Sequence, residues 1–340
     1  MSLANGAWSM VFKRMPVLTK APLVSLIVPV YNALPYLPDL LDSIDNQGLT
    51  DREFQVVLID DGSTDGSSGV LDRFRRDRRN VQVLTQPNSG WPGMPRNRGL
   101  DVATGRWVFF ADVDDYLVPR GLAELVRFGD QQAAEIVIPR VLRCGTRSGR
   151  RKFVSTQPSI TKRQAFRTFT PHKLIDRQLI EANDLRFPEG EIRLEDGILL
   201  SRCYLLADKI SVLADQDYYF FRGREDGQNI SSRRIVPEAY VASLEKIAAN
   251  VHELSRGPAM TRALIAEIIR RKVLRFYLPT RFPQYDSGRQ AEWLNAHGAF
   301  LTKHADSAVR ARLSEPRQRL LDCIIAGDVA AVRTEIQLQA

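Results

Sequence analysis

Short apolar runs alternate with helix-patterned segments through the first 140 residues of the chain. Residues 24–30 (VSLIVPV) and 54–59 (FQVVLI) are rich in β-branched side chains and almost wholly apolar, as strands buried on both faces are. Three shorter runs of the same kind follow at 81–84, 107–111 and 135–139. Between these runs, apolar residues have helical spacing at 37–44, at 70–74 and after Pro119. Strands that recur about every 25 residues between helices predict an α/β fold with a doubly wound, mainly parallel sheet flanked by helices.

The alternation stops after residue 140, which predicts a change in architecture. Residues 161–180 have helical spacing with Thr161 as the N-cap, and another helix is predicted at 196–207. From Pro237 onward the pattern is helical to the last residue. The chain therefore divides into predicted parts: an N-terminal extension at 1–21, an α/β domain at 22–235 with halves at 22–140 and 141–235, and an α-helical module at 236–340.

Composition and charge narrow the possible functions. The 340 residues are 44% hydrophobic and include three cysteines without CxxC spacing, which argues against a zinc site or a disulfide framework. The net charge is +8, and residues 141–180 hold ten Lys/Arg against one acid. This basic block is either a solvated surface or a groove for an anionic substrate, a phosphopolymer or a membrane. Nucleic acid is disfavoured, because the block lacks interleaved aromatic residues and a known binding motif.

Three acids stand directly after the predicted strand at 107–111, in the stretch FFADVDDYL. Asp112 and Asp114 share a face if the extended backbone continues, and carboxylates so close together repel each other unless a cation joins them. Oxygen ligands of this kind suit Mg²⁺ or Mn²⁺, and Mg²⁺ usually contacts substrate phosphates as well. The alternative is that Asp114 or Asp115 only caps the helix that follows.

Polar clusters also follow other predicted strands, at the edge where a doubly wound sheet binds its ligands. In LIDDGSTDGS, Asp61 can accept a hydrogen bond from the N–H of a base, or the stretch is only a tight turn between strand and helix. In PVYN, Tyr31 can stack on a base, or it is an incidental turn residue. In NSGWPGMPRNRGL, Arg96 near a helix start can bind a phosphate, or it is a surface arginine.

The order and spacing of these four motifs resemble the nucleotide-sugar domain of glycosyltransferase family two, which has the GT-A fold, over about residues 22–140. The resemblance implies that Asp61 contacts uracil. It also implies that Asp112 and Asp114 hold Mn²⁺ or Mg²⁺ against the diphosphate of the donor, with Asp114 as the favoured direct ligand. The other donor-binding positions implied by the family are Pro29, Tyr31, Asn32, Asn88 and Arg96.

A second segment, residues 173–204, resembles the acceptor-side part of bacterial family members, which ends in a Glu-Asp pair. This resemblance assigns the catalytic base to Asp196, beside Glu195. A carboxylate suits the task, because it can remove the proton of an acceptor hydroxyl as the new bond forms. Without the upstream motifs, the pair would indicate only an acidic helix start. The candidates for further phosphate or acceptor contacts are Glu195, Arg222 and Arg224.

The helical C-terminal module resembles that of wall-teichoic-acid glycosyltransferases, in which an additional module drives oligomerisation. The resemblance thus implies an inverting, metal-dependent transfer from a UDP-sugar to a hydroxyl of a bacterial surface polysaccharide, a teichoic-acid-like polymer or a glycolipid. The acceptor would be a glycan or a polyol phosphate, free or lipid-linked. A cytoplasmic location, with peripheral attachment at the inner face of the membrane as an option, and a homo-oligomer through the C-terminal helices are further expectations.

Two other functions stay open on the sequence alone. One is a GT-A-like module that has lost catalysis and binds anionic polymers. The other is a nucleotidyltransferase on a similar sheet, which would consume a nucleoside triphosphate and release pyrophosphate. A dehydrogenase is disfavoured, because YNALPYLP rather than a GxGxxG turn follows the first strand.

Overall fold

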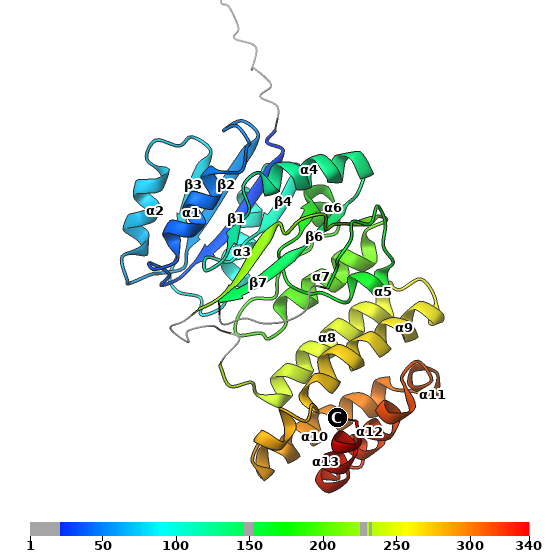
Figure 1. Ribbon diagram of the computed structural model, residues 1–340. Helices are drawn as coiled ribbons and strands as arrows, with labels where there is room; N and C mark the ends of the chain where they lie inside the picture. Colours follow the sequence, from blue (N-terminus) through cyan, green and yellow to red (C-terminus); the bar gives the residue numbers. More distant parts are fainter. Residues whose placement is uncertain (1–20, 146–151, 225–229, 231–232, 340) are drawn as a thin grey trace, which may run out of the picture.

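A seven-stranded sheet forms the centre of the computed structural model, which describes residues 21–145, 152–224, 230 and 233–339 (Figure 1). The strands lie in the order β3-β2-β1-β4-β8-β6-β9, and all run parallel except β8, which is antiparallel to β4 and β6. The predicted α/β class with a mainly parallel sheet is confirmed. The strands are β1 (Val24–Val30), β2 (Phe54–Asp60), β3 (Val81–Thr85), β4 (Trp107–Phe110), β6 (Ile136–Pro139), β8 (Leu174–Asp176) and β9 (Ile210–Leu213).

Alternating side chains of β1 divide the apolar core between two faces of the sheet. Leu26 and Val28 belong to the cluster on one face, and Ile27 belongs to the cluster on the other. Gly99 lets a helix lie directly on the second face, because a Cβ there would sit 2.3 Å from Cγ2 of Ile27. The first face is covered by α1 (Leu37–Asp45), α2 (Ser67–Arg75) and α4 (Gly121–Gln132), and the second by α3 (Gly93–Val102), α6 (Arg177–Ala182) and α7 (Glu195–Leu206).

A smaller three-stranded sheet brings the acid-rich stretch after β4 together with later parts of the chain. Its order is β5-β10-β7, with β10 antiparallel to β5 and parallel to β7. The backbone N–H of Arg222 in β10 donates to Oδ1 of Asp115 at 2.8 Å, so this sheet supports the acids from one side. Its strands are β5 (Tyr116–Leu117), β7 (Val141–Gly145) and β10 (Tyr219–Gly223).

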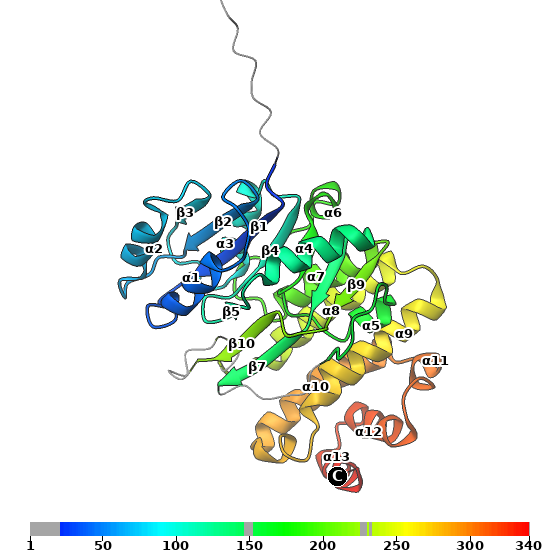
Figure 2. The same ribbon diagram turned by 45° about the horizontal axis from the view of Figure 1, so that its top comes forward.

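The first two helices of the C-terminal module, α8 (Pro237–Leu254) and α9 (Pro258–Ile268), pack against the part of the sheet domain that carries α5 (Lys162–Ala165) and α7 (Figures 1 and 2). Asn250 in α8 donates to the carbonyl oxygen of Ile198 in α7 at 3.1 Å, and one apolar cluster runs from Ile27 to Ile336. The predicted helical module is confirmed, while oligomerisation through it stays a prediction. Among the described helices, none has both the length and the apolar character that crossing a membrane requires.

The helical module begins with two long helices joined by a tight turn. After the second of these helices the chain passes through a π-helical turn (Ile269–Val273) and two short 3₁₀ turns (Leu274–Phe276 and Phe282–Gln284). The α-helices of the module are α8 (Pro237–Leu254), α9 (Pro258–Ile268), α10 (Ser287–His304), α11 (Ser307–Arg310), α12 (Glu315–Ile325) and α13 (Val329–Leu338).

The helix predicted at 161–180 is wrong. Only α5 (Lys162–Ala165) is helical at its start, capped by the Thr161 hydroxyl as predicted, and β8 and α6 follow. The strand forms because Leu174 and Ile175 fill the gap between β4 and β6, a long-range pairing that leaves no local signal in the sequence. The predicted extension at 1–21 lies outside the described residues apart from Ala21.

Candidate active site

The site lies at the carboxyl ends of β1, β2 and β4, where the polar motifs of the sequence meet. Asn32 follows β1, Asp61 follows β2, and Asp112 follows β4. These three strands are neighbours in the sheet, so their ends share one edge. Ligands of doubly wound sheets bind in the crevice beyond such an edge. The fold therefore gathers the predicted donor-binding motifs in one place.

The Asp61 carboxylate is buried and held by the turn that follows β3. Its Oδ1 accepts from the backbone N–H of Ser89 at 3.0 Å and also from the side-chain amide of Gln86. The Ser89 hydroxyl donates to Oδ2 at 2.9 Å. Asn88 donates from Nδ2 to the main-chain oxygen of Asp61 at 3.0 Å. The structure thus brings Asp61 and Asn88 together, and their contact with a nucleotide stays a prediction.

The PVYN stretch leaves the sheet beside the turn that follows β2. Pro29 is still within β1, in register with Ile59, whereas Tyr31 is 44% exposed and stands clear for stacking. Asn32 has a φ of 44°, and its Oδ1 accepts from the backbone N–H of Thr64 at 2.8 Å. A left-handed backbone at an asparagine is tolerated because the short amide side chain bonds locally. Roles for Pro29, Tyr31 and Asn32 in donor binding stay predictions.

Arg96 joins the donor end of the site to the proposed catalytic base. It is 2% exposed and lies in the first part of α3, so the surface-arginine alternative is wrong. Nη2 contacts Oδ1 of Asp112 at 2.7 Å, and Nη1 contacts Oδ1 of Asp196 at 2.7 Å. Nη1 also lies 3.6 Å from Oε1 of Glu195. A buried arginine with three carboxylates around it links parts of the chain that the sequence separates widely.

The electrostatics of this cluster differ from one acid to the next. Burial raises the pKa of Asp196 well above its usual range, although Arg96 acts in the opposite direction. A carboxylate with a raised pKa is a stronger base, which suits the removal of a proton from a hydroxyl group. Against the effect of burial, Arg96 and His172 lower the pKa of Asp112 far below its usual range. Asp112 therefore stays ionised, as a ligand for a cation must be.

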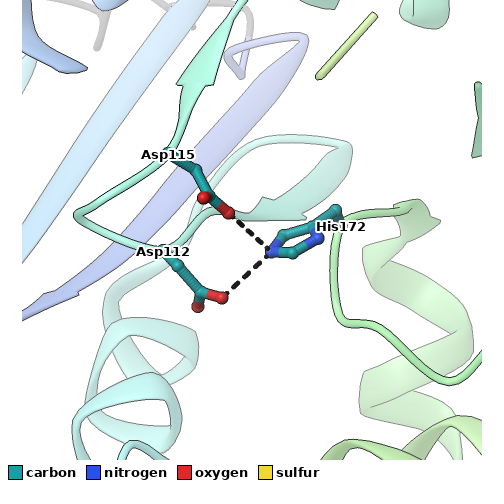
Figure 3. Close-up of side chains that lie close together, drawn as sticks. All are labelled: Asp112, Asp115 and His172. Atoms are coloured by element: carbon teal, nitrogen blue, oxygen red, sulfur yellow. Dashed lines mark hydrogen bonds and ion pairs between the residues drawn. The ribbon is translucent and has the colours of Figure 1, made fainter. Parts of the chain in front are cut away.

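His172 and Tyr219, which no sequence motif indicated, complete the acid-rich corner. Nε2 of His172 lies 3.2 Å from Oδ2 of Asp112 and 3.6 Å from Oδ2 of Asp115 (Figure 3). The imidazole stacks on the Tyr219 ring, with 4.1 Å between the ring centroids. Burial, together with the charges of Asp112 and Asp114, raises the pKa of the Asp115 carboxyl. His172 comes from the segment before β8, and no spacing in the sequence connects it to the acids.

The acids after β4 do not cap the next helix. That helix, α4, begins at Gly121 with Arg120 at its N-cap and without a side-chain cap. The capping alternative is therefore wrong for Asp114 and Asp115. Instead, Asp115 forms a group with Asp112 and His172. Each of the three residues offers one candidate ligand atom, and these atoms lie within 4.8 Å of one another.

This donor set fits a divalent cation, because it combines carboxylate oxygens with one imidazole nitrogen, and the burial of neighbouring carboxylates is costly without a positive charge. Asp112 belongs both to this group and to the predicted pair with Asp114. The main-chain oxygen of Asp114 accepts from Nε of Arg222 at 2.8 Å. The pair of Asp112 and Asp114 as ligands of an ion stays a prediction, as does the identity of the ion.

Arg222 in β10 and Arg224, which directly follows β10, lie beside the donor end. The Arg222 guanidinium lies 5.1 Å from the centroid of the Tyr36 ring, and that of Arg224 lies 4.8 Å from the same ring. Nη2 of Arg224 donates to the main-chain oxygen of Asn32 at 3.1 Å. Both cations therefore lie beside the PVYN turn and the acids, where the phosphates of a donor are expected. Contacts to phosphate stay predictions.

Basic residues also gather near Asp196, where the helical module meets the sheet domain. Burial, reinforced by Lys272 and Arg143, lowers the pKa of Lys152 to about 7. Burial also lowers the pKa of Lys272 to about 8, although Asp196 partly offsets it. Lys173 is fully buried and donates to Oγ1 of Thr170 at 3.1 Å. We call Arg143, Lys152, Lys173, Arg271, Lys272 and Arg275 the basic cluster.

Half of the basic cluster comes from the block at 141–180 and half from the helical module. Lys152 and Lys173 line a pocket together with Arg143, Thr168 and Thr170. Arg271 and Lys272 lie on the π-helical turn Ile269–Val273. Insertions of this kind into α-helices are frequent at functional sites. The first half belongs to a block that is visible in the sequence, but only the fold places Lys272 within electrostatic reach of Asp196.

Comparison with known proteins places both parts of the chain. Residues 25–181 match Glycosyl transferase family 2, and residues 237–335 match the Glycosyl transferase TarS linker domain. The poly(ribitol-phosphate) beta-N-acetylglucosaminyltransferase TarS of Staphylococcus aureus (strain Mu50 / ATCC 700699) is 31% identical over 322 residues, which cover 91% of this chain and 54% of TarS. The poly(ribitol-phosphate) beta-glucosyltransferase of Bacillus spizizenii is 31% identical over 252 residues, which cover 73% of this chain and 40% of that protein.

The crystal structure of S. aureus TarS 1–349 in complex with UDP-GlcNAc matches this fold with a TM-score of 0.84 at 29% identity, covering 93% of this chain and 91% of that one. The predicted GT-A fold is thereby confirmed. This chain spans about half the length of TarS and less of the Bacillus enzyme. The strand-end motifs and the helical module both lie within the matched segments, and the chain belongs to glycosyl transferase family 2.

Proposed function

We propose that this chain transfers a sugar from a UDP-sugar to a hydroxyl group of a polyol-phosphate polymer, with inversion at the anomeric carbon and with a divalent cation. The observation that carries the proposal is the Arg96 bridge, which holds Asp112 at the donor end and Asp196 at the acceptor side in one buried cluster. A transfer reaction needs its donor and its base in fixed relation, because reacting atoms must approach within a few tenths of an ångström of a productive geometry.

In the proposed reaction Asp196 removes the proton of the acceptor hydroxyl. The hydroxyl oxygen forms a bond to the anomeric carbon while the bond from that carbon to the diphosphate oxygen breaks, so UDP leaves with its electron pair. Attack on the face opposite the leaving group inverts the anomeric centre. The raised pKa of the buried Asp196 carboxyl supports its role as the base.

Charge on the leaving diphosphate has to be stabilised at the donor end. A divalent cation, when bound, supplies Lewis-acid stabilisation of that charge. Asp112, with Asp114 or Asp115, would hold it, and His172 lies within reach of the same position. Arg222 lies on β10 and Arg224 directly follows that strand, and both place positive charge near the same region.

The acceptor side is built for negative charge. The basic cluster adjoins Asp196 and combines residues from the sheet domain and the helical module. Crowded cations with lowered pKa values favour an anionic ligand, because a phosphate offsets both their burial and their mutual repulsion. TarS and the Bacillus relative are both described as acting on poly(ribitol-phosphate), and the solved TarS complex contains UDP-GlcNAc. These likenesses support a UDP-sugar donor and a polyol-phosphate acceptor here.

A direct test is to incubate the chain with Mn²⁺, a synthetic ribitol-phosphate oligomer and either UDP-GlcNAc or UDP-glucose, and to analyse the oligomer by mass spectrometry. We expect the mass of one sugar to be added per turnover, with release of UDP. Binding of both substrates without any product would instead support an inactive binding module. Release of pyrophosphate from a nucleoside triphosphate would support a nucleotidyltransferase.

A further inference from the structure

Next to Arg96, helix α3 carries a second buried polar residue, Asn97. Its side chain is hydrogen-bonded to the segment that leads to the proposed base Asp196. We propose that Asn97 is a positioning residue, which docks the loop before α7 onto α3 and thereby fixes Asp196 relative to Arg96 and Asp112. The inference rests on the proposed transfer reaction, and it adds a residue that touches neither substrate.

Asn97 binds both polar groups of one main-chain residue in that loop. Its side chain is 7% exposed, and Nδ2 donates to the carbonyl oxygen of Phe187 at 2.9 Å. Oδ1 accepts from the backbone N–H of Phe187 at 2.9 Å. Nδ2 also donates to Oε1 of Glu189 at 2.9 Å. A carboxamide that pairs with an N–H and a C=O together holds the loop in one register, because shifting the loop would leave buried polar groups unpaired.

Other contacts also hold this loop against α3 and the end of β4. Gly93, in the first turn of α3, lies so close that a Cβ there would sit 2.3 Å from the main-chain oxygen of Pro188. The Phe187 ring lies 5.1 Å from the Arg96 guanidinium. It also packs edge-on against Phe110 at the end of β4, with 5.0 Å between centroids. Asn97 thus provides the polar fixation within an otherwise apolar and steric contact.

The loop determines where α7 begins. Its path from Phe187 to α7 includes Gly190 and Leu194, with φ values of 82° and 59°. The N-cap of α7 is Leu194, which supplies no side-chain cap, so the helix start depends on how the loop is held. Glu195 and Asp196 are the first residues of α7. Loosening the loop would therefore move Asp196 away from its 2.7 Å contact with Arg96.

The test compares Asn97→Ala with the wild-type chain. We expect kcat for transfer to fall by about 10²-fold, since a displacement of roughly 1 Å from the productive geometry can cost that much. The dissociation constant for UDP-GlcNAc with Mn²⁺ should change by less than about twofold, because Asn97 does not face the donor motifs. Amide hydrogen exchange should become faster across residues 187–196 and remain unchanged in β1 and β2.

Two further variants separate positioning from stability. Gln290→Ala in α10 removes another buried side-chain amide, which donates to the carbonyl oxygens of Phe282 and Tyr285 at 3.0 and 2.9 Å and so has these partners within the helical module. It should lower the melting temperature without lowering kcat. Glu189→Gln retains an oxygen acceptor for Asn97, so kcat should stay near the wild-type value.

An unchanged kcat and unchanged exchange at 187–196 in Asn97→Ala would overturn the inference. A loss of kcat that Gln290→Ala matches at equal stability would do the same. Failure of the proposed function looks different, because the wild-type chain itself would then make no product, while the faster exchange of residues 187–196 in Asn97→Ala would still be observed.

Discussion

The donor end and the basic cluster treat charge in opposite ways, although both adjoin Asp196. At the donor end, acids and cations lie within contact distance of one another. Arg96, for example, contacts three acids, Asp112, Glu195 and Asp196. In the basic cluster, burial lowers the pKa of Lys152 to about 7, and the cations Lys272 and Arg143 act in the same direction. The first region is preorganised by internal ion pairs, which suits a site that must align reacting atoms. The second gathers like charges, which suits recognition of a flexible polyanion.

Of the variants that test this comparison, the one that removes the base Asp196 should have the largest effect on transfer. In Asp196→Asn we expect kcat for transfer to fall by about 10³-fold or more, because the amide cannot accept the acceptor proton. The UDP dissociation constant should remain within a few-fold, since Arg96 keeps its contact with Asp112. Steady-state kinetics and calorimetry check the two parts. Full transfer activity in this variant would remove Asp196 from the reaction.

The acids after β4 should control donor binding in the presence of metal. We expect Asp114→Ala to weaken UDP binding in Mn²⁺ by roughly 10-fold or more, because a ligand of the ion that faces the diphosphate is lost. Asp115→Asn serves as the matched variant and should weaken it less. Calorimetric titration of UDP with and without Mn²⁺ measures both. A larger effect at Asp115 would assign the ion to the group with His172, and no effect at either would argue against a metal at these acids.

The basic cluster should affect the acceptor and not the donor. For Lys272→Gln we expect the KM for a ribitol-phosphate oligomer to rise about 10-fold and its salt dependence to weaken, since one phosphate contact is lost. Lys246→Gln on the exposed side of α8 provides a control of equal charge change. Donor KM should be the same in both variants. An acceptor KM that does not depend on salt in the wild-type chain would indicate a neutral glycan.

The smallest expected effect concerns pH. The pKa values of Lys152 and Lys272 are about 7 and about 8, so both lose their charge as pH rises from 6 to 9, and acceptor affinity should fall a few-fold over that range. Folding stability should change with pH in the opposite direction. A lysine whose pKa is lowered by folding binds fewer protons when folded than when unfolded between its two pKa values, so stability rises with pH there. Lys152→Gln should flatten the pH dependence of the acceptor KM.

Much of the donor end was predictable, because it consists of local patterns. The strands β1, β2 and β4 are continuous apolar runs, and each is followed directly by its polar motif, so topology alone brings Asn32, Asp61 and Asp112 to one edge. Asp196 came from the resemblance of its segment to a family. The spacing of residues could not have shown its contact with Arg96, which lies 100 positions away.

The basic cluster and the His172 corner were much less predictable. Lys272 reaches Asp196 only because α8 and α9 pack on the sheet domain, and such packing depends on apolar surface that many arrangements would bury equally well. His172 meets Asp112 because β8 inserts between β4 and β6 in an antiparallel sense. The alternation of strands and helices predicted parallel neighbours there and gave no indication of that insertion.

The most direct test of the account is a proton NMR measurement on the glycosylated product. The wild-type chain would be mixed with a UDP-α-sugar, Mn²⁺ and a ribitol-phosphate oligomer, with Asp196→Asn run in parallel. We predict an anomeric signal with the large coupling of a β-linked sugar from the wild-type chain and no such signal from the variant. An α-linked product, or equal product from both proteins, would contradict transfer by a single displacement with Asp196 as the base.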